Sequence, residues 1–264
     1  MKTRDVDLSA ELDFALSLAD LADATTLQPF HDRGFTVDWK ANRTEVTELD
    51  RRTEEVLAET IARFRPDDAV YGEEFGERGA VGGPRWTWVL DPIDGTSNYA
   101  RGVPVWATLI GLLDPNDVPV LGVVSAPAIG ARWHGATGVG AFNRRGPIQV
   151  SAVSRIDEAQ VSTTPNAAWD AVGGYQRVVD LGRNAYRVRG FGDFWQHMLV
   201  AEGAIDVAVD AIGLEPYDTA ALWPIVGEAG GRITDRLGGN SFRNGSAVST
   251  NGILHTAVLD AIAC

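Results

Sequence analysis

Within residues 86–98 a buried strand runs directly into a turn that carries two carboxylates. Trp88, Val89 and Leu90 form a short apolar run, which is typical of an interior strand of a layered domain. Pro92 follows them, and proline has a fixed φ and no N–H to give to a sheet. We therefore expect the strand to stop at Pro92 and the turn to stand at its C-terminal end.

The turn after this strand has the chemistry of a binding site. Asp91 and Asp94 are held close together, so they repel unless a proton, a cation or a metal lies between them. Gly95 allows close approach of a ligand to the backbone, and Thr96 and Ser97 offer hydroxyl and N–H groups suited to an oxyanion. The alternative is an acidic surface turn in which Asp94 caps a helix.

Charge and cysteine content exclude several classes of function. The net charge of −13 would repel nucleic acid, and an anionic substrate would need a metal to shield it. Cys264 is the one cysteine, which excludes a disulfide within the chain and argues against cysteine-bound metal. No apolar run is long enough to span a membrane, and the N-terminus leads into an amphipathic stretch rather than a signal core. We expect a cytoplasmic enzyme without a membrane partner.

The rest of the first half alternates between helix, loop and sheet. The expected elements are a helix at 8–30, an irregular loop at 31–49, a helix to about 64, a strand at 69–72, a Gly-rich loop at 77–85 and antiparallel sheet over 104–151. The last sheet strand is expected at 148–150. An aromatic sheet edge around Trp106 and Trp133 could serve in a homodimer, although burial in the sheet explains both residues equally well.

The second half alternates strand and helix more regularly. The expected strands are 161–164, 187–188, 205–209, 231–234 and 247–250, and the expected helices are 171–182, 194–203, 218–230 and one from 253. This pattern predicts an α/β layer beside the α+β first half. We expect a single domain over 1–264, with closely packed subdomains at about 1–152, carrying most metal ligands, and 153–264, carrying substrate specificity.

Further carboxylates stand where predicted elements begin or end. Glu73 and Glu74 follow a strand, which makes them the second acidic pair at a strand end. Asp50 lies near a helix start, where the helix dipole favours a negative charge. Asp193 and Asp218 each lie at a helix start and would serve as N-caps. Each position alone is explained by capping or solvation, but four such coincidences favour one shared site.

Together these motifs resemble the inositol monophosphatase family. The matching segments are Thr47-Glu-Leu-Asp50, Gly72-Glu-Glu74, Asp91-Pro-Ile-Asp-Gly-Thr-Ser-Asn98, Tyr217-Asp-Thr-Ala-Ala221 and Glu228-Ala-Gly-Gly-Arg-Ile-Thr234, in order over about residues 8–262. The family usually has Trp where this chain has Tyr217. The resemblance implies a layered αβαβα sandwich of the inositol monophosphatase and fructose-bisphosphatase type, and relatives are often homodimers.

The resemblance also implies a metal site for two or three Mg²⁺ ions. One ion would be held by Glu73, Asp91 and the carbonyl of Ile93, a second by Asp91, Asp94 and Asp218, and a third by Glu73 and Asp50. Oxygen ligands suit Mg²⁺, and Mn²⁺ accepts the same ligands. The ions would explain how the carboxylates tolerate one another. Inhibition by Li⁺ is a further family expectation.

In this family a metal-activated water attacks phosphorus in line, with no covalent enzyme intermediate. By resemblance, Thr96 and Asp50 would orient the water, with assistance from Glu73. Backbone N–H groups at Gly95 and Thr96, together with Ser97, would bind the phosphate.

The second half is most similar to the actinobacterial histidinol-phosphate phosphatases of this family, through Arg187-Val-Arg-Gly-Phe-Gly-Asp-Phe194 and Val200-Ala-Glu-Gly-Ala-Ile-Asp206. A carboxylate at Asp193 would pair with the substrate ammonium, unless it only caps the helix. The second acidic contact is either Asp210 or Glu215. The full set of expected substrate contacts is Asp94, Arg189, Gly192, Asp193, Asp210, Glu215 and Asp218.

The leading hypothesis is therefore an Mg²⁺-dependent phosphomonoesterase that hydrolyses L-histidinol phosphate in histidine biosynthesis. The nearest alternative is the same chemistry on inositol-1-phosphate or another polyol phosphate. A non-catalytic binding protein on the same fold ranks lower, since the expected ligands and Thr96 are all present. Nucleotide bisphosphates would need basic residues for the second phosphate, and the acidic pocket candidates argue against them.

Overall fold

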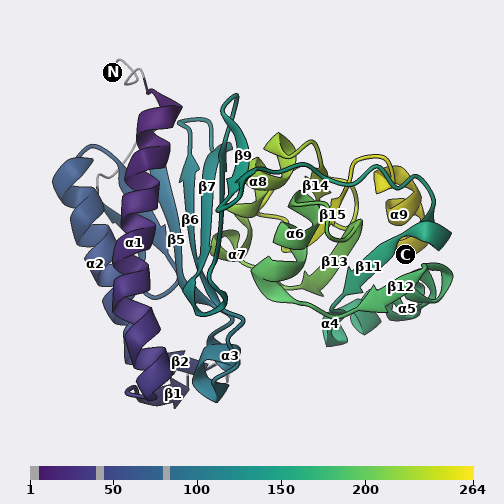
Figure 1. Ribbon diagram of the computed structural model, residues 1–264, viewed down its shortest axis with the longest axis horizontal. Coiled ribbons are helices and arrows are strands. Elements are labelled where there is room, and N and C mark those ends of the chain that lie inside the picture. The colour runs from purple at the N-terminus through teal and green to yellow at the C-terminus, as the bar shows by residue number, and fades with distance from the viewer. Residues whose placement is uncertain (1–5, 40–44, 80–83) are drawn as a thin grey trace.

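The computed structural model describes residues 6–39, 45–79 and 84–264, which are arranged in five layers. Figure 1 shows α1 (Leu8–Asp32) and α2 (Glu48–Phe64) on one face of a large sheet. On the other face of the sheet lie α6 (Asp193–Ala201), α7 (Pro216–Thr219) and α8 (Leu222–Glu228), followed by a smaller sheet. The outer layer is α4 (Ala167–Ala171), α5 (Tyr175–Asn184) and α9 (His255–Ile262). The layered αβαβα prediction is confirmed.

The large sheet has eight strands within the described ranges, in the order β10-β9-β8-β7-β6-β5-β3-β4. Their bounds are β3 Ala69–Gly72, β4 Gly76–Gly79, β5 Thr87–Asp94, β6 Ala107–Leu113, β7 Pro119–Ala126, β8 Ala131–Ala136, β9 Gly140–Asn143 and β10 Gly146–Pro147. Only β3 and β5 pair in parallel among these neighbours. The parallel pair therefore brings the C-terminal ends of β3 and β5, with their acidic turns, to one edge of the sheet.

Alternating side chains pack the large sheet on both faces, as the period of a strand requires. Trp88 and Ile110 face α1 and α2, where they pack with Leu57. Leu109 faces the opposite way and packs with Phe194 of α6 and the residues of α8. Both faces are thus buried, which explains the nearly continuous apolar runs of these strands.

The smaller sheet has the order β12-β11-β13-β15-β14. Its strands are β11 Gln160–Thr163, β12 Arg187–Arg189, β13 Val207–Ile212, β14 Arg232–Thr234 and β15 Ser246–Thr250. β11 pairs in parallel with β12 and β13, whereas β15 is antiparallel to β13 and β14. Its outer face packs Val161 against Trp169, Val178 and Val258 of the outer helices.

The prediction that β5 stops at Pro92 is wrong. The strand runs to Asp94, and its pairing with β6 shifts register between Asp91 and Asp94. A bulge of this kind accommodates a residue without an N–H, and the Pro92 carbonyl accepts a hydrogen bond of 2.8 Å from Thr108 Oγ1. The two aspartates therefore project from a distorted strand end rather than from a free turn.

Two predicted loops contain strands. Residues 31–49 include β1 (Val37–Trp39) and β2 (Glu45–Thr47), which pair antiparallel, and residues 77–85 begin within β4. In each case pairing with a neighbouring strand supplies the hydrogen bonds that a short segment cannot supply alone. The portions of these loops at 40–44 and 80–83 lie outside the described residues.

Three other predictions need correction in the second half and at the sheet edge. The expected helix at 218–230 is two helices, because Pro224 cannot donate to the carbonyl of Ala220. The helix expected at 171–182 begins only at Tyr175, as α5, because α4 ends at Ala171 and Gly173 follows it at φ +72°. The last strand of the large sheet is β10 rather than 148–150.

Of the two explanations for Trp106 and Trp133, a dimer edge or burial within the fold, the structure supports burial. Trp106 is completely buried with Phe30 and Tyr99, and Trp133 is buried with its Nε1 donating to Glu202 at 2.9 Å. Neither side chain is exposed enough to contact a partner subunit. Among the helices in the described parts of the chain, none is both long and apolar enough to cross a membrane.

Candidate active site

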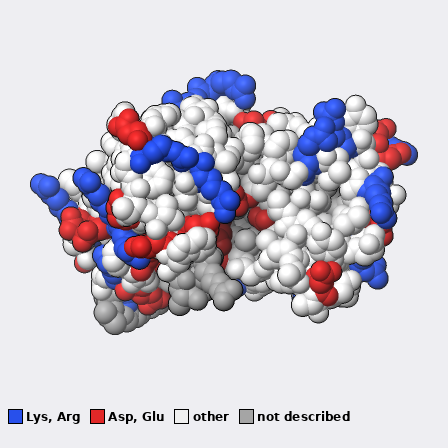
Figure 2. Space-filling view, turned by 90° about the horizontal axis from the view of Figure 1, so that it is seen from below, with Lys and Arg blue, Asp and Glu red and all other residues white. Residues whose placement is uncertain are grey.

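Acidic side chains gather in the hollow between the two halves of the molecule that carry the two sheets (Figure 2). Among the residues that the structure describes, acidic side chains form two groups of three, and in each group one carboxylate oxygen of each residue lies within 4.8 Å of those of the other two. The first group is Asp50, Glu73 and Glu74; the second is Asp91, Asp94 and Asp218. The structure therefore brings together residues that are remote in sequence: Asp91 and Asp218 of the second group lie 127 positions apart.

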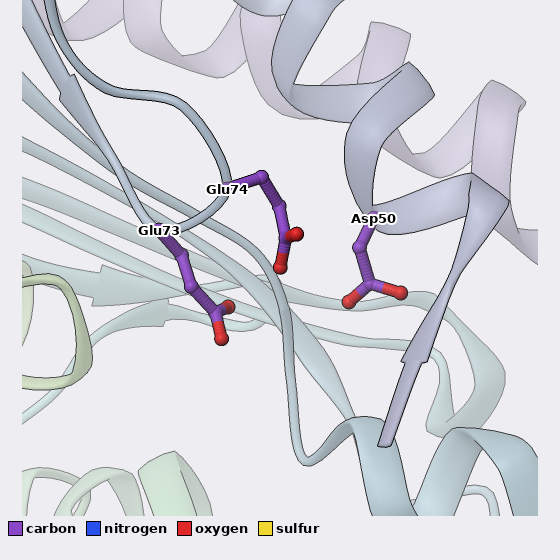
Figure 3. Close-up of side chains that lie close together, drawn as sticks. All are labelled: Asp50, Glu73 and Glu74. Atoms are coloured by element: carbon purple, nitrogen blue, oxygen red, sulfur yellow. The ribbon is translucent and has the colours of Figure 1, made fainter. Parts of the chain in front are cut away.

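The first group joins α2 to the turn after β3. Figure 3 shows the Asp50 carboxylate at the start of α2, facing the same space as the carboxylates of Glu73 and Glu74. Asp50 Oδ2 accepts hydrogen bonds from Thr47 N at 2.8 Å and Thr47 Oγ1 at 2.7 Å in a capping box. Asp50 Oδ1 accepts from Thr96 Oγ1 at 3.2 Å. Asp50 thus both stabilises the helix start and faces the site.

Burial raises the pKa of Asp50 to about 6. The hydrogen bonds from Thr47 oppose this shift, and the neighbouring charges of Glu73 and Glu74 add to it. A carboxylate of this kind takes up a proton far more readily than one in water, unless a cation lies beside it.

The second group lies at the bulge of β5 and the start of α7. Burial is the main cause that raises the pKa of Asp91 and of Asp94 well above the usual range, and neighbouring carboxylates raise both further. Asp218 has its pKa raised to about 7, again chiefly by burial. The N-cap of α7 is Glu215, and Asp218 stands at N3, where it accepts from Glu215 N at 2.7 Å. Asp218 thus contributes to the cap of α7 as the N3 residue of a capping box, not as the N-cap itself.

The residues present fit hard divalent cations. The donors in both groups are carboxylate oxygens, which is the ligand type that Mg²⁺, Mn²⁺ and Ca²⁺ prefer. Several buried carboxylates with raised pKa values are stable as anions only when positive charge is supplied. Glu73 is the largest charged contributor to the pKa of Asp91, so the two groups lie near each other.

Glu74 belongs to the first group, although the sequence argument assigned no role to it. The signal was available as the second glutamate of Gly72-Glu-Glu74, but an acidic residue after a strand usually only faces water. The predicted backbone ligand, the carbonyl of Ile93, accepts from Thr96 Oγ1 at 2.9 Å. How the ligands divide between ions stays a prediction.

The expected phosphate-binding segment begins at Gly95, which has φ +82° and so occupies a conformation that favours glycine. α3 (Thr96–Arg101) follows it. The Thr96 hydroxyl lies between two acceptors, the Ile93 carbonyl and Asp50. Ser97 is exposed, with Oγ 3.4 Å from Glu45 Oε1. Phosphate binding by these three residues stays a prediction.

Asp193 does not cap α6 as an N-cap would. Gly192 is the N-cap at φ +75°, and Asp193 is the first helical residue, with an unusual φ of +47°. Its Oδ2 lies 3.4 Å from Asn98 Nδ2 and 3.4 Å from where a Cβ on Gly95 would stand. Although part of the residue is exposed, partial burial is the main cause that raises its pKa to about 6. The carboxylate thus lies beside the predicted phosphate segment.

Of the two candidates for a second acidic contact, Asp210 is already bound within the protein. It is 6% exposed and accepts from Thr164 Oγ1 at 2.8 Å and Ala211 N at 2.7 Å, and its Oδ2 is 3.0 Å from His197 Nε2. Glu215 is exposed at the start of α7. Arg189 is also exposed, and its Nη1 donates to the Val188 carbonyl at 2.7 Å.

Comparison with known proteins identifies the family to which this chain belongs. Residues 7–263 match the profile of the inositol monophosphatase family. The chain belongs to the inositol monophosphatase family. This confirms the resemblance drawn from the motifs, and membership implies a phosphate ester as substrate.

Relatives in this family match almost end to end. The histidinol-phosphatase of Streptomyces coelicolor is 42% identical, over 96% of this chain and 97% of the relative. The histidinol-phosphatase of Mycobacterium tuberculosis is 44% identical, over 94% of this chain and 96% of the relative. The structure of an inositol monophosphatase from Anabaena superposes with a TM-score of 0.83 at 29% identity, covering 97% of this chain and 96% of that one.

Proposed function

We propose that this protein hydrolyses L-histidinol phosphate to L-histidinol and phosphate with bound Mg²⁺, as a step in histidine biosynthesis. The observation that carries the proposal is the carboxylate of Asp193 beside the Gly95 turn. A negative charge there disfavours a phosphate ester that has no cationic group. It pairs with the ammonium group of an aminoalkyl phosphate. Two relatives of more than 40% identity, matched over nearly their whole length, are named histidinol-phosphatases.

The acidic groups would hold the metal. One ion would be held by Asp91, Asp94 and Asp218, and another by Asp50, Glu73 and Glu74. The metal would be Mg²⁺ or Mn²⁺, with two or three ions bound. Bound Mg²⁺ would shield the phosphate charge and make water a better nucleophile at neutral pH.

Residues of the chain would orient the attacking water. The Thr96 hydroxyl lies within hydrogen-bond distance of Asp50 Oδ1 and of the Ile93 carbonyl, so its position is defined from two sides. With a cation bound to the first group Asp50 stays ionised, and its Oδ1 would accept from the Thr96 hydroxyl that orients the water. Asp193 would hold the substrate ammonium, and the exposed Glu215 is the better second contact because Asp210 is already engaged.

The test is the substrate preference of Asp193→Asn. We expect kcat/KM for histidinol phosphate to fall by about ten- to a hundredfold, because a charge-assisted hydrogen bond of about 1.5–3 kcal/mol is lost. Activity on inositol-1-phosphate should not fall. Asp170→Asn, which neutralises an exposed carboxylate on α4, is the matched control and should change neither activity.

The outcomes separate the alternatives. Equal losses on both substrates would reject Asp193 as the ammonium contact. A wild-type preference for inositol-1-phosphate would keep the metal groups and favour a polyol phosphatase. Absence of phosphate release from either ester, with Mg²⁺ bound, would favour a non-catalytic binding protein. The homodimer, the cytoplasmic location, the subdomain division near residue 152 and the Li⁺ sensitivity remain predictions.

A further inference from the structure

We propose that Glu54 is a positioning residue that holds the turn of Glu73 and Glu74 in place against Asp50. The proposal rests on the metal-dependent function proposed above. Glu54 is completely buried on α2, four residues after Asp50, so that both side chains lie on the same face of the helix. Neither the family motifs quoted above nor the acidic groups include it.

The Glu54 carboxylate binds the turn after β3 through both of its oxygen atoms. Oε2 accepts from Glu74 N at 2.7 Å, and Oε1 accepts from Phe75 N at 3.1 Å. The backbone of the turn is therefore fixed to α2 by two hydrogen bonds to a charged acceptor, which are stronger than hydrogen bonds between neutral groups. The same helix carries Asp50, so one rigid element sets the separation between Asp50 and the two glutamates.

Gly72 provides the space for this carboxylate. A Cβ on Gly72 would stand 2.0 Å from Glu54 Oε1 and 2.2 Å from Glu54 Cδ, so any side chain there would force the Glu54 carboxylate to move. Gly72 lies in β3, and its φ is not in the left-handed region, so backbone conformation does not demand glycine there. The glycine of the Gly72-Glu-Glu74 motif is thus explained by contact with Glu54.

The arrangement favours metal binding over stability. Asp50, Glu73 and Glu74 repel one another, and burial of a further carboxylate at Glu54 has its own desolvation cost. The geometry is useful when a cation is to be bound, because ligands that are already in place lose less conformational entropy on binding. Glu54 should therefore affect cation affinity more than the chemical step.

The experiment measures Mg²⁺ binding to the full chain by calorimetry, with wild type, Glu54→Gln and Glu55→Gln. Glutamine keeps the shape but turns one acceptor into a donor that faces an N–H group. We expect Glu54→Gln to weaken Mg²⁺ binding by about ten- to a hundredfold, in the range found for residues that orient metal ligands. The Mg²⁺ concentration for half-maximal activity should rise in parallel, with kcat at saturating Mg²⁺ nearly unchanged. Glu55 is exposed on the same helix, so Glu55→Gln removes the same charge and should change neither value.

A second variant disrupts the contact between Gly72 and Glu54 by changing Gly72. Gly72→Ala should also weaken Mg²⁺ binding. Because both changes break the same interaction, the double variant should bind Mg²⁺ as tightly as whichever single variant binds it less tightly. If Glu54→Gln does not fold, Gly72→Ala alone decides by the same measurement.

Wild-type Mg²⁺ affinity in folded Glu54→Gln or Gly72→Ala would overturn the proposal, as would a loss of kcat without a loss of affinity. An equal loss in Glu55→Gln would assign the effect to charge alone and would also overturn it. A wild-type protein that binds no Mg²⁺ would instead reject the metal-dependent function.

Discussion

The backbone N–H of Phe194 donates a hydrogen bond of 2.8 Å to Oδ2 of Asp94, across 100 residues of sequence. Asp94 belongs to the second acidic group, and Phe194 directly follows Asp193, the proposed ammonium contact. The start of α6 is therefore held by a candidate metal ligand rather than by a capping side chain of its own. A change that orders Asp94 in the second acidic group should therefore also order Asp193 at the start of α6.

This link predicts that Mg²⁺ slows amide hydrogen exchange in residues 190–197. An ion that orders Asp94 would also strengthen its hydrogen bond to Phe194 N and so protect the start of α6. Exchange measured by mass spectrometry with and without Mg²⁺ checks it, with α5 as the segment that should not respond. Protection limited to residues 91–96 would show that the two regions are independent.

Thr96→Val should lower kcat by about a hundredfold or more and leave Mg²⁺ affinity almost unchanged. The hydroxyl that lies between Asp50 and the Ile93 carbonyl is lost, whereas the shape of the side chain is kept. Thr96→Ser retains the hydroxyl and should retain most activity. Steady-state phosphate release at saturating Mg²⁺ is the measurement. A Thr96→Val enzyme with normal kcat would remove Thr96 from the proposed mechanism.

The metal-free protein should be more stable at pH 5 than at pH 8. The pKa of Asp50 is raised to about 6 and that of Asp218 to about 7, against 3.8 for an unperturbed aspartate. Between pH 4 and 7 the folded chain therefore holds more protons than the unfolded chain, so the free energy of unfolding decreases as the pH rises. Above pH 7 these two groups add no further decrease.

Urea unfolding in the presence of a chelator, at pH 5 and pH 8, checks this prediction. Added Mg²⁺ should recover stability at pH 8, because it binds the deprotonated carboxylates of the folded state. Equal metal-free stability at the two pH values would show that the acidic groups do not carry the raised pKa values.

Asp210→Asn should lower stability rather than change substrate preference. Asp210 accepts from Thr164 Oγ1 and Ala211 N and lies 3.0 Å from His197 Nε2, so an amide there leaves part of a buried network unsatisfied. We expect a loss of about 1–3 kcal/mol in the free energy of unfolding. The ratio of kcat/KM for histidinol phosphate and inositol-1-phosphate should stay constant, in contrast to Asp193→Asn. A selective loss on histidinol phosphate would return Asp210 to the substrate site.

The family, the layers and five of the six acidic residues that form the two groups follow from the sequence alone; Glu74 does not. Local patterns carry this information: apolar runs define the strands, and the motif from Asp91 to Asn98 places oxygen ligands beside a glycine. The main error in β5 concerned Pro92. Its missing N–H does end a strand in isolation, but pairing with β6 resumes beyond the bulge and carries the strand to Asp94.

The tertiary structure alone decided how these residues are held. Glu54 binding the turn of Glu74, Asp94 accepting from Phe194 N, and Asp193 lying beside Gly95 all join segments that are remote in sequence. It also decided that Asp210 belongs to a buried network, whereas Glu215 is exposed. A local pattern specifies which groups a segment offers, but packing of the layers determines which of them meet, because hydrogen bonds act only over about 3 Å.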